Sequence, residues 1–242
     1  MQKDSLGDRM KAYEIVPQSR LIKRMPTIIR IDGKAFHTFT KRFKDSFSLE
    51  MHDLMVHTSA YLVNNIQNCV LAYTQSDEIS LLLTDWNTFE TQQWFDGKIQ
   101  KITSVAASLA TGSFNAYYHN MLQNPDCGIE FLYETAFFDA RVFNLPKEEV
   151  VNYFIWRQQD ASRNSVQMLG RMYFSDKELH KKSNNDIQNM LLLQKDINWN
   201  DLDTWKKRGA CATKAGVDNE IPVFTQMRNY VGKFIDEASC DG

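Results

Sequence analysis

Residues 28–33, Ile-Ile-Arg-Ile-Asp-Gly, decide the fold of this chain. The run is short, rich in β-branched side chains and ends in a turn-forming Asp-Gly pair, a pattern typical of a buried strand. A second apolar run, residues 70–83, contains the polar segment Gln-Ser-Asp-Glu at 75–78. This segment predicts a bend between two further strands. Both runs therefore bring carboxylates to the end of a strand.

Working outward from these runs, the spacing predicts the remaining elements of a small sheet. Residues 47–66 carry apolar side chains at helical spacing. Residues 98–119 predict a second helix, and residues 137–145 predict a fourth strand. The order strand-helix-strand-strand-helix-strand is that of the ferredoxin-like fold, on which nucleotidyltransferase palms and nucleotide cyclases are built. We therefore expect an α+β fold, with an antiparallel ferredoxin-like sheet of the palm type and flanking helices.

Asp32 and Asp77 would end central strands at the same edge of this sheet. Two carboxylates ~4 Å apart repel by ~1 kcal/mol in water and by ~4 kcal/mol at a surface-like dielectric. A divalent cation removes this repulsion, and Mg²⁺ prefers one or two carboxylates together with substrate phosphates. Two such ions about 3.5–4 Å apart form a clamp for phosphoryl transfer. The alternative is that both acidic segments are ordinary polar turns.

Basic residues near these acids suggest phosphate binding. The run Lys-Ala-Phe-His-Thr-Phe-Thr-Lys-Arg-Phe-Lys at 34–44 follows the first acid, and backbone amides after a strand-ending glycine can cradle a triphosphate. A surface loop anchored by its phenylalanines is equally compatible with this run. Lys98 and Lys101 share the first turn of a predicted helix, where a phosphate would meet both lysines and free amides. A solvated basic turn is the alternative there.

The chain beyond Pro146 is expected to be largely helical. Polar residues at helical spacing, including Arg157 and Asn164, either face solvent or line a nucleic-acid groove. A later segment is polar, turn-rich and basic, and its charge predicts RNA contacts through Lys207 and Arg208. We expect a palm-like catalytic core with an N-terminal helix at 1–145. Residues 146–242 would form a helical extension and a basic C-terminal appendage, packed on the core as one compact unit.

The composition is that of an ordinary globular protein, with 43% hydrophobic and 24% charged residues among 242. With 28 basic and 30 acidic residues the net charge is −2, so RNA would have to meet a local basic patch. The four cysteines form no CxxC pair, which argues against a zinc site or a redox motif. The first residues lack a signal-peptide core, and no apolar run approaches ~18 residues. We expect a cytoplasmic protein without a membrane partner.

Four motifs occur in order along the chain: RIDGKAFHTF at 30–39, YTQSDE at 73–78, FDAR at 138–141 and WRQQD at 156–160. Together they resemble the motifs of the tRNA(His) guanylyltransferase family, and the resemblance extends over residues 4–214. Eukaryotic members of that family carry His-Ile-Asn-Asn-Leu-Tyr-Asn after the last motif. Here residues 162–168 read Ser-Arg-Asn-Ser-Val-Gln-Met and keep only Asn164. This departure favours the guanylyltransferase-like branch of bacteria and archaea.

The resemblance implies a template-dependent nucleotidyltransferase that works in the 3′-5′ direction. Such an enzyme adds nucleotides to the 5′ end of truncated tRNA, after activation by ATP or on a 5′ triphosphate. Two Mg²⁺ ions would be held by Asp32, Asp77 and the Gly33 carbonyl, with Glu78 as a further catalytic acid. ATP, GTP and other nucleoside triphosphates would be substrates, and a homotetramer is implied because one tRNA spans several subunits. The nucleotide contacts implied are Gly33, Lys34, Ala35, Phe36, His37, Lys44, Ser76, Asp77, Lys98 and Lys101.

Other functions remain open at this point. A non-templated tRNA(His) guanylyltransferase would use the same acids. A nucleotide cyclase, or a nucleotidyltransferase for small molecules, would turn over ATP or GTP with Mg²⁺ and without RNA, and would have no use for the basic appendage. An RNA-binding module in which the acids are turn residues would bind tRNA equally well in EDTA or after Asp32→Asn.

Overall fold

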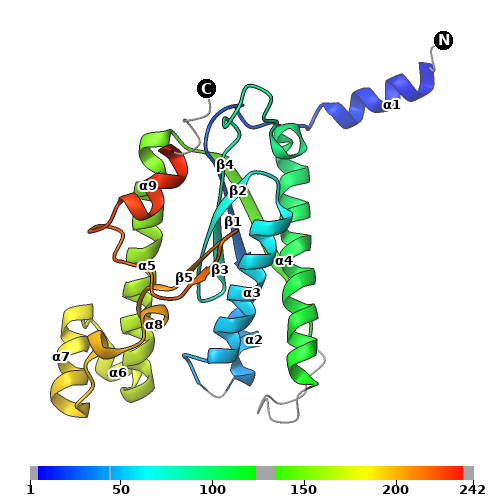
Figure 1. The fold of residues 1–242 in the computed structure, drawn as a ribbon. Helices are drawn as coiled ribbons and strands as arrows, with labels where there is room; N and C mark the ends of the chain where they lie inside the picture. Colours follow the sequence, from blue (N-terminus) through cyan, green and yellow to red (C-terminus); the bar gives the residue numbers. More distant parts are fainter. Residues whose placement is uncertain (1–4, 44, 124–133, 237–242) are drawn as a thin grey trace.

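The structure is a computed structural model that describes residues 5–43, 45–123 and 134–236 (Figure 1). The strands are β1 (Thr27–Gly33), β2 (Cys69–Gln75), β3 (Glu78–Leu83), β4 (Phe138–Asn144), β5 (Ala210–Thr213) and β6 (Gly216–Asp218). The helices are α1 (Ser5–Ile15), α2 (Phe36–Phe39), α3 (Leu49–Asn65), α4 (Ile99–Leu122), α5 (Lys147–Tyr173), α6 (Asp176–Leu179), α7 (Asn184–Lys195), α8 (Thr204–Arg208) and α9 (Asn229–Asp236). Three 3-10 turns are η1 (Thr40–Arg42), η2 (Trp94–Gly97) and η3 (Trp199–Asp201).

The strands form one antiparallel sheet in the order β4-β1-β3-β2-β5-β6. The first four strands and helices α3 and α4 have the predicted ferredoxin-like arrangement, so the expected fold class is confirmed. Strands β5 and β6 were not predicted. Because β5 pairs with β2, with Ala210 opposite Thr74, the sheet continues across the predicted boundary at residue 145. The division at 145 stays a prediction.

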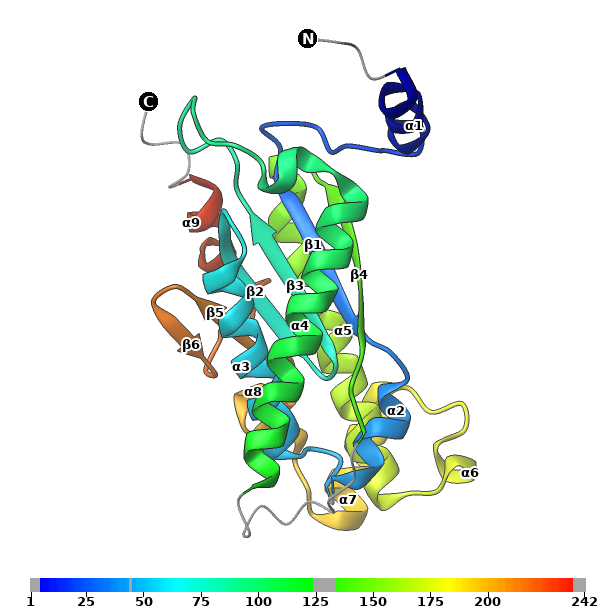
Figure 2. The same ribbon diagram turned by 90° about the vertical axis from the view of Figure 1, so that its right-hand side faces the viewer.

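Helices cover both faces of the sheet, as Figures 1 and 2 show. Helices α3 and α4 pack on the face that contains Ile29 and Ile31, while α5 and α9 pack on the face that contains Ile28. This alternation follows from the two-residue period of a strand. The same period sends Arg30 and Asp32 to the α5 face. On that face the sheet therefore changes from apolar to charged along β1.

The end of α5 continues past the sheet and joins a small appendage with its own apolar cluster. Val166 and Leu169 of α5 pack there with Ile187 and Leu191 of α7. Ser183 caps α7 with a reciprocal capping box. The predicted helical appendage is thus present, and it extends beyond the acid-bearing end of the sheet (Figure 1).

Helix α1 projects away from the body of the molecule (Figure 1). None of its residues is buried, and Leu6, Met10 and Tyr13 are all exposed. Within the described residues, no helix has the combination of length and apolar character that crossing a bilayer requires.

Candidate active site

A cavity of about 650 Å³ lies where the β2–β3 hairpin and the end of β1 meet helices α3, α5 and α8. This volume is typical of sites for small molecules and cofactors. The cavity is lined by the acids of the hairpin and β1, by polar residues of α5 and by aromatic and basic residues of α3 and α8. Its lining includes Asp32, Thr40, Lys41, His52, Ser76, Asp77, Glu78, Asp160, Asn164, Trp205 and Lys206.

Asp32 and Asp77 come together in this cavity, as the sequence predicted. The Gly33 amide donates to the Asp77 carbonyl over 3.0 Å, which joins the end of β1 to the tip of the hairpin. Burial raises the pKa of Asp77, and the negative charge of Asp32 raises it further. The hairpin tip includes Ser76 at φ +53°, and its hydroxyl donates to the Asp77 carboxylate over 3.2 Å. Backbone strain of this kind clusters at functional sites.

The two carboxylates fit a hard divalent cation. Both line the cavity, and the charge of Asp32 is only partly compensated, since Arg30 and Arg141 approach it no closer than 3.8 Å. Among the described residues no group of three or more His, Cys, Asp or Glu side chains could bind a metal on its own. Mg²⁺ suits such a site because it keeps several waters and takes one or two carboxylates plus substrate phosphates. The donor set therefore matches a metal ion shared with a nucleotide.

The raised pKa of Asp77 leads to a prediction on stability. Replacing Asp77 by Asn should raise Tm in EDTA at pH 7, by about 2–4 °C for each ~1 kcal/mol of relieved penalty. The penalty on stability is complete above the raised pKa of folded Asp77 and disappears as pH falls below the ordinary pKa of 3.8, where the carboxyl is neutral in both states. Thermal unfolding between pH 4 and 8 tests this.

Asp139 provides the control for this prediction, because it pairs with Asp32 on the neighbouring strand but its side chain is 65% exposed. Asp139→Asn should leave Tm unchanged. Mg²⁺ should stabilise the unchanged protein and not the Asp77 variant. A Tm that falls in Asp77→Asn in EDTA would contradict the assignment of an uncompensated carboxylate.

Glu78 has a different environment from the other two acids. Arg157 Nη2 donates to its carboxylate over 3.0 Å, and Arg157 Nε lies 2.7 Å from the other carboxylate oxygen. Arg30 also pairs with Glu78. Since two guanidinium groups balance its charge, Glu78 is engaged with protein groups instead of facing an open metal position. These pairings position Glu78 at the base of the hairpin, where it also lines the cavity, and its predicted catalytic role stays a prediction.

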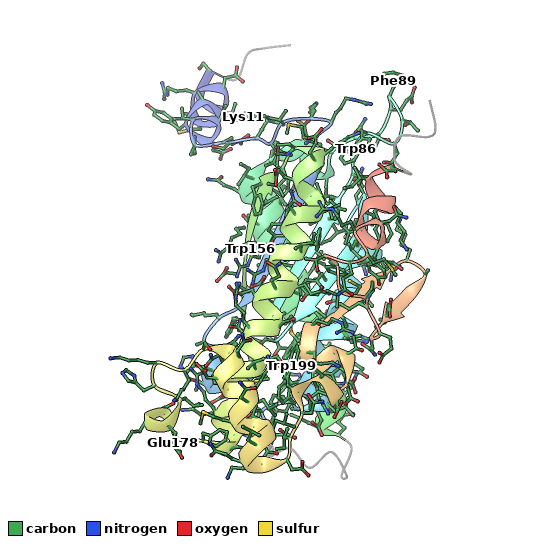
Figure 3. The ribbon with its side chains drawn as sticks, turned by 90° about the vertical axis from the view of Figure 1, so that its left-hand side faces the viewer. Lys11, Trp86, Phe89, Trp156, Glu178 and Trp199 are labelled. Atoms are coloured by element: carbon green, nitrogen blue, oxygen red, sulfur yellow. The ribbon has the colours of Figure 1, made fainter. Side chains whose placement is uncertain are left out.

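Arg157 was predicted to contact RNA, and the structure corrects this expectation. Its side chain is 5% exposed and also pairs with Asp160 over 3.0 Å. The preceding residue, Trp156, is the one that lies on the outer side of α5 (Figure 3). Helical spacing places Arg157 against the sheet, where it meets the charged end of β3. Asn164, two turns further along α5, is exposed and lines the cavity, so it remains a candidate RNA contact.

The loop after β1 differs in part from the predicted phosphate cradle. The amides of Gly33 and Lys34 donate to the carbonyls of Asp77 and Phe137, so neither is available to a phosphate. Phe36 is buried against three other aromatic rings. Ala35 adopts φ +56° and turns the chain into α2. No described residue accepts from the amides of residues 35–37, and the side chains of Lys34 and His37 are exposed. Lys44 lies outside the described residues.

Lys98 and Lys101 do not reach this cavity within one chain. Strand β3 runs away from the hairpin and α4 starts near the far end, so both lysines lie beside Arg20 and the start of β1. Thr27 and Asp32 are five residues apart along β1, which corresponds to about 17 Å. The structure therefore does not bring these lysines to the acids of the same chain, and their predicted contact with a nucleotide stays a prediction. Sequence order alone did not show at which end of the sheet α4 begins.

The basic run at 206–208 is arranged differently from the prediction. Lys207 and Arg208 donate to backbone carbonyls of Asn200 and Ile221, whereas Lys206 lines the cavity. The run of basic residues in the sequence showed that this segment lies near the site, but it did not show which of the three side chains lines the cavity. Several other lining residues were missed as site residues, and Arg30, His52 and Trp205 are three of them. Only Arg30 had a signal, because it lies two residues before Asp32 and so on the same face of β1.

Comparisons with known proteins identify the family of this chain. The family model described as Thg1, tRNAHis guanylyltransferase, matches residues 7–146. The structure resembles that of a bacterial tRNA(His) guanylyltransferase-like protein in complex with ATP, with a TM-score of 0.89 and 44% identity, covering 96% of this chain and 99% of that chain. A complex of such a bacterial protein with GTP gives a TM-score of 0.81, 41% identity and the same coverage. The tRNA(His) guanylyltransferase of Saccharomyces cerevisiae is 26% identical over 217 residues, which are 83% of this chain and 87% of that protein.

The antiparallel sheet is shared with these proteins, and their family is one of nucleotidyltransferases. The expectation that the chain is an enzyme of this class is confirmed. The chain belongs to the tRNA(His) guanylyltransferase family.

Proposed function

We propose that this chain is a template-dependent 3′-5′ nucleotidyltransferase that adds nucleotides to the 5′ end of truncated tRNA. The observation that carries the proposal is the Asp32–Asp77 pair in a cavity of nucleotide size. The 44% identity to a protein solved with ATP, and the 41% identity to one solved with GTP, support nucleoside triphosphates as ligands. The altered sequence at 162–168 supports the repair activity over guanosine addition to tRNA(His) alone.

In this proposal the chain positions two reacting groups. Asp32, Asp77 and the Gly33 carbonyl would hold Mg²⁺, which activates a hydroxyl and offsets phosphate charge when bound. Ser76 and the amides of residues 35–37 would orient the triphosphate, with charge supplied by Lys41 of the cavity wall. The 3′-hydroxyl of the incoming nucleotide attacks the activated 5′ phosphorus of the RNA. Pyrophosphate leaves a triphosphate end, and AMP leaves an adenylylated end.

The homotetramer stays a prediction. The nucleotide role of Lys98 and Lys101 also stays a prediction, and it depends on a neighbouring copy of the chain. Both lysines lie at the opposite end of the sheet from Asp32. They can therefore serve a nucleotide at Asp32 only from a neighbouring copy of the chain. Light scattering in solution would count the copies, and a monomer would remove both lysines from the proposed site. The predicted cytoplasmic location likewise stays a prediction.

The proposed activity is tested with a tRNA transcript that lacks its first nucleotide. We expect addition at the 5′ end in the presence of Mg²⁺, ATP and all four nucleoside triphosphates, with the added base complementary to the opposing base. Sequencing the products while the opposing base is varied measures this. Guanosine added whatever lies opposite would indicate the tRNA(His) activity instead. Consumption of ATP or GTP without addition to RNA would contradict the proposal and favour a cyclase-like reaction.

A further inference from the structure

The cavity wall formed by α3 and α8 is aromatic, in contrast to the acidic wall. His52 of α3 and Trp205 of α8 both line the cavity and stack with ring centroids 4.3 Å apart and an interplanar angle of 20°. His52 Nε2 lies 3.1 Å from Asn219 Oδ1, which fixes the orientation of the imidazole. Burial lowers the pKa of His52, so the ring is neutral near pH 7. The stacked pair thus lines the same cavity as Asp32 and Asp77.

Helix α8 is short, but its contacts hold it firmly beside the sheet. The Tyr73 hydroxyl donates to the Arg208 carbonyl over 2.8 Å. Gly209 then packs so closely on β2 that a Cβ atom there would lie 2.3 Å from the Thr74 carbonyl oxygen. Trp205 is therefore fixed next to the strand that leads into the acidic hairpin. A preorganised aromatic ring loses little conformational freedom when a ligand stacks on it.

A cation accompanies this aromatic surface. Lys206 lines the cavity, its Nζ lies 5.1 Å from the Trp205 ring centroid, and it pairs with Asp203 over 2.8 Å. An aromatic ring next to a basic side chain is the combination that nucleic-acid grooves use, because the ring takes the base and the cation takes the phosphate. Phe43 and Lys41 of the loop after β1 also line the cavity, but the Phe43 ring is 7% exposed and packs in the core cluster.

We propose that Trp205, backed by His52, is a stacking platform for a nucleobase bound in the cavity. The proposal rests on the proposed function, because it requires a nucleotide or an RNA end to enter this cavity. The base can come from a nucleoside triphosphate or from the 5′ end of the RNA. Stacking alone does not distinguish these sources, since every base has a π face.

The test measures binding of three probes separately, without turnover: ATP, GTP and a 5′-phosphorylated tRNA transcript lacking its first nucleotide. We expect Trp205→Leu to weaken binding of at least one probe roughly tenfold or more, the range of one base stack. Trp205→Phe keeps an aromatic ring and should cause a smaller loss. The matched control is Phe89→Leu, which removes a 92% exposed aromatic ring at the opposite end of the molecule (Figure 3) and should leave all affinities within about twofold.

The pattern of losses identifies the source of the base. Weaker binding of ATP or GTP assigns the platform to a nucleoside triphosphate, and weaker binding of tRNA alone assigns it to the RNA end. If both Trp205 variants bind every probe within about twofold of the unchanged protein, the platform is refuted and the proposed function stands. If the unchanged protein binds none of the probes, the proposed function fails and the platform with it.

Fluorescence provides a second measurement that does not depend on the leucine variant being folded. Each probe that binds should quench tryptophan emission of the unchanged protein, because a stacked base lies against the indole of Trp205. The quench should be clearly smaller in Trp205→Phe, whose fold is checked by circular dichroism. An equal quench in both proteins would overturn the assignment to Trp205.

Discussion

Replacing Asp32 or Asp77 by alanine should lower the rate of nucleotide addition about 10³-fold or more, while the protein stays folded. A metal ion contributes several kcal/mol of charge stabilisation to such a reaction, and ~4 kcal/mol corresponds to three powers of ten in rate. Both carboxylates are partly exposed and line the cavity at the ends of their strands. Truncating either side chain to alanine therefore leaves no void in the hydrophobic core. Single-turnover addition to a 5′-triphosphorylated tRNA, which needs no activation by ATP, measures the effect.

Asp139→Ala is the matched control, because Asp139 occupies the neighbouring strand opposite Asp32 and does not line the cavity. Its rate should stay within about threefold of the unchanged protein. Circular dichroism would verify the fold of all three variants. A folded Asp77→Ala protein that adds nucleotides at the normal rate would remove the metal assignment and leave the acids as turn residues.

Replacing Arg157 by alanine should produce the largest loss of stability, about 3 kcal/mol, which lowers Tm by about 6–12 °C. The buried guanidinium pairs with both Glu78 and Asp160. Its removal leaves the buried Glu78 carboxylate with Arg30 as its remaining partner. Denaturant unfolding with the free energy extrapolated to water measures the change.

Arg163→Ala is the control for this prediction, since Arg163 also pairs with Asp160 over 3.0 Å but is 56% exposed. Such a surface pair contributes ~1 kcal/mol at most. The double variant Arg157→Met with Glu78→Gln removes both charges of the buried pair, so it should recover part of the loss. Equal stability of Arg157→Ala and Arg163→Ala would show that the buried pair does not hold α5 to the hairpin.

The positioning role of Arg157 also predicts a change in activity that a loss of stability alone would not produce. Glu78 follows Asp77 in the chain and begins β3, so a displaced Glu78 should shift the hairpin tip and with it Asp77, the proposed metal-binding acid. In Arg157→Ala, assayed well below its Tm, the Mg²⁺ concentration needed for half-maximal rate should rise. An unchanged Mg²⁺ dependence would limit Arg157 to a role in stability.

Local sequence patterns determined the elements that build the core and its acids. The β-branched run at residues 28–33 and the polar bend at 75–78 are short-range signals, and all three strands formed where they were predicted. The helix predicted at 47–66 is α3, with a Ser48 cap whose side chain accepts from the Met51 amide. The short strands β5 and β6 had no such signal, because residues 210–218 are too few to show a period and gain their pairing from β2.

The sequence by itself determined the α+β class and the family. It also predicted that Asp32 and Asp77 lie at the same end of the sheet, because the order of the strands and the turn residues show where each strand ends. Only the tertiary structure decided which charges are free to act. In the folded chain Arg157 pairs with a carboxylate, and Lys207 and Arg208 donate to backbone carbonyls. Lys98 and Lys101 lie at the far end of the sheet. The tertiary structure also brought His52 and Trp205 together across 153 residues of chain (205 − 52). Charge and aromatic character are properties of single residues, whereas pairing, burial and stacking depend on neighbours that only the folded chain brings together.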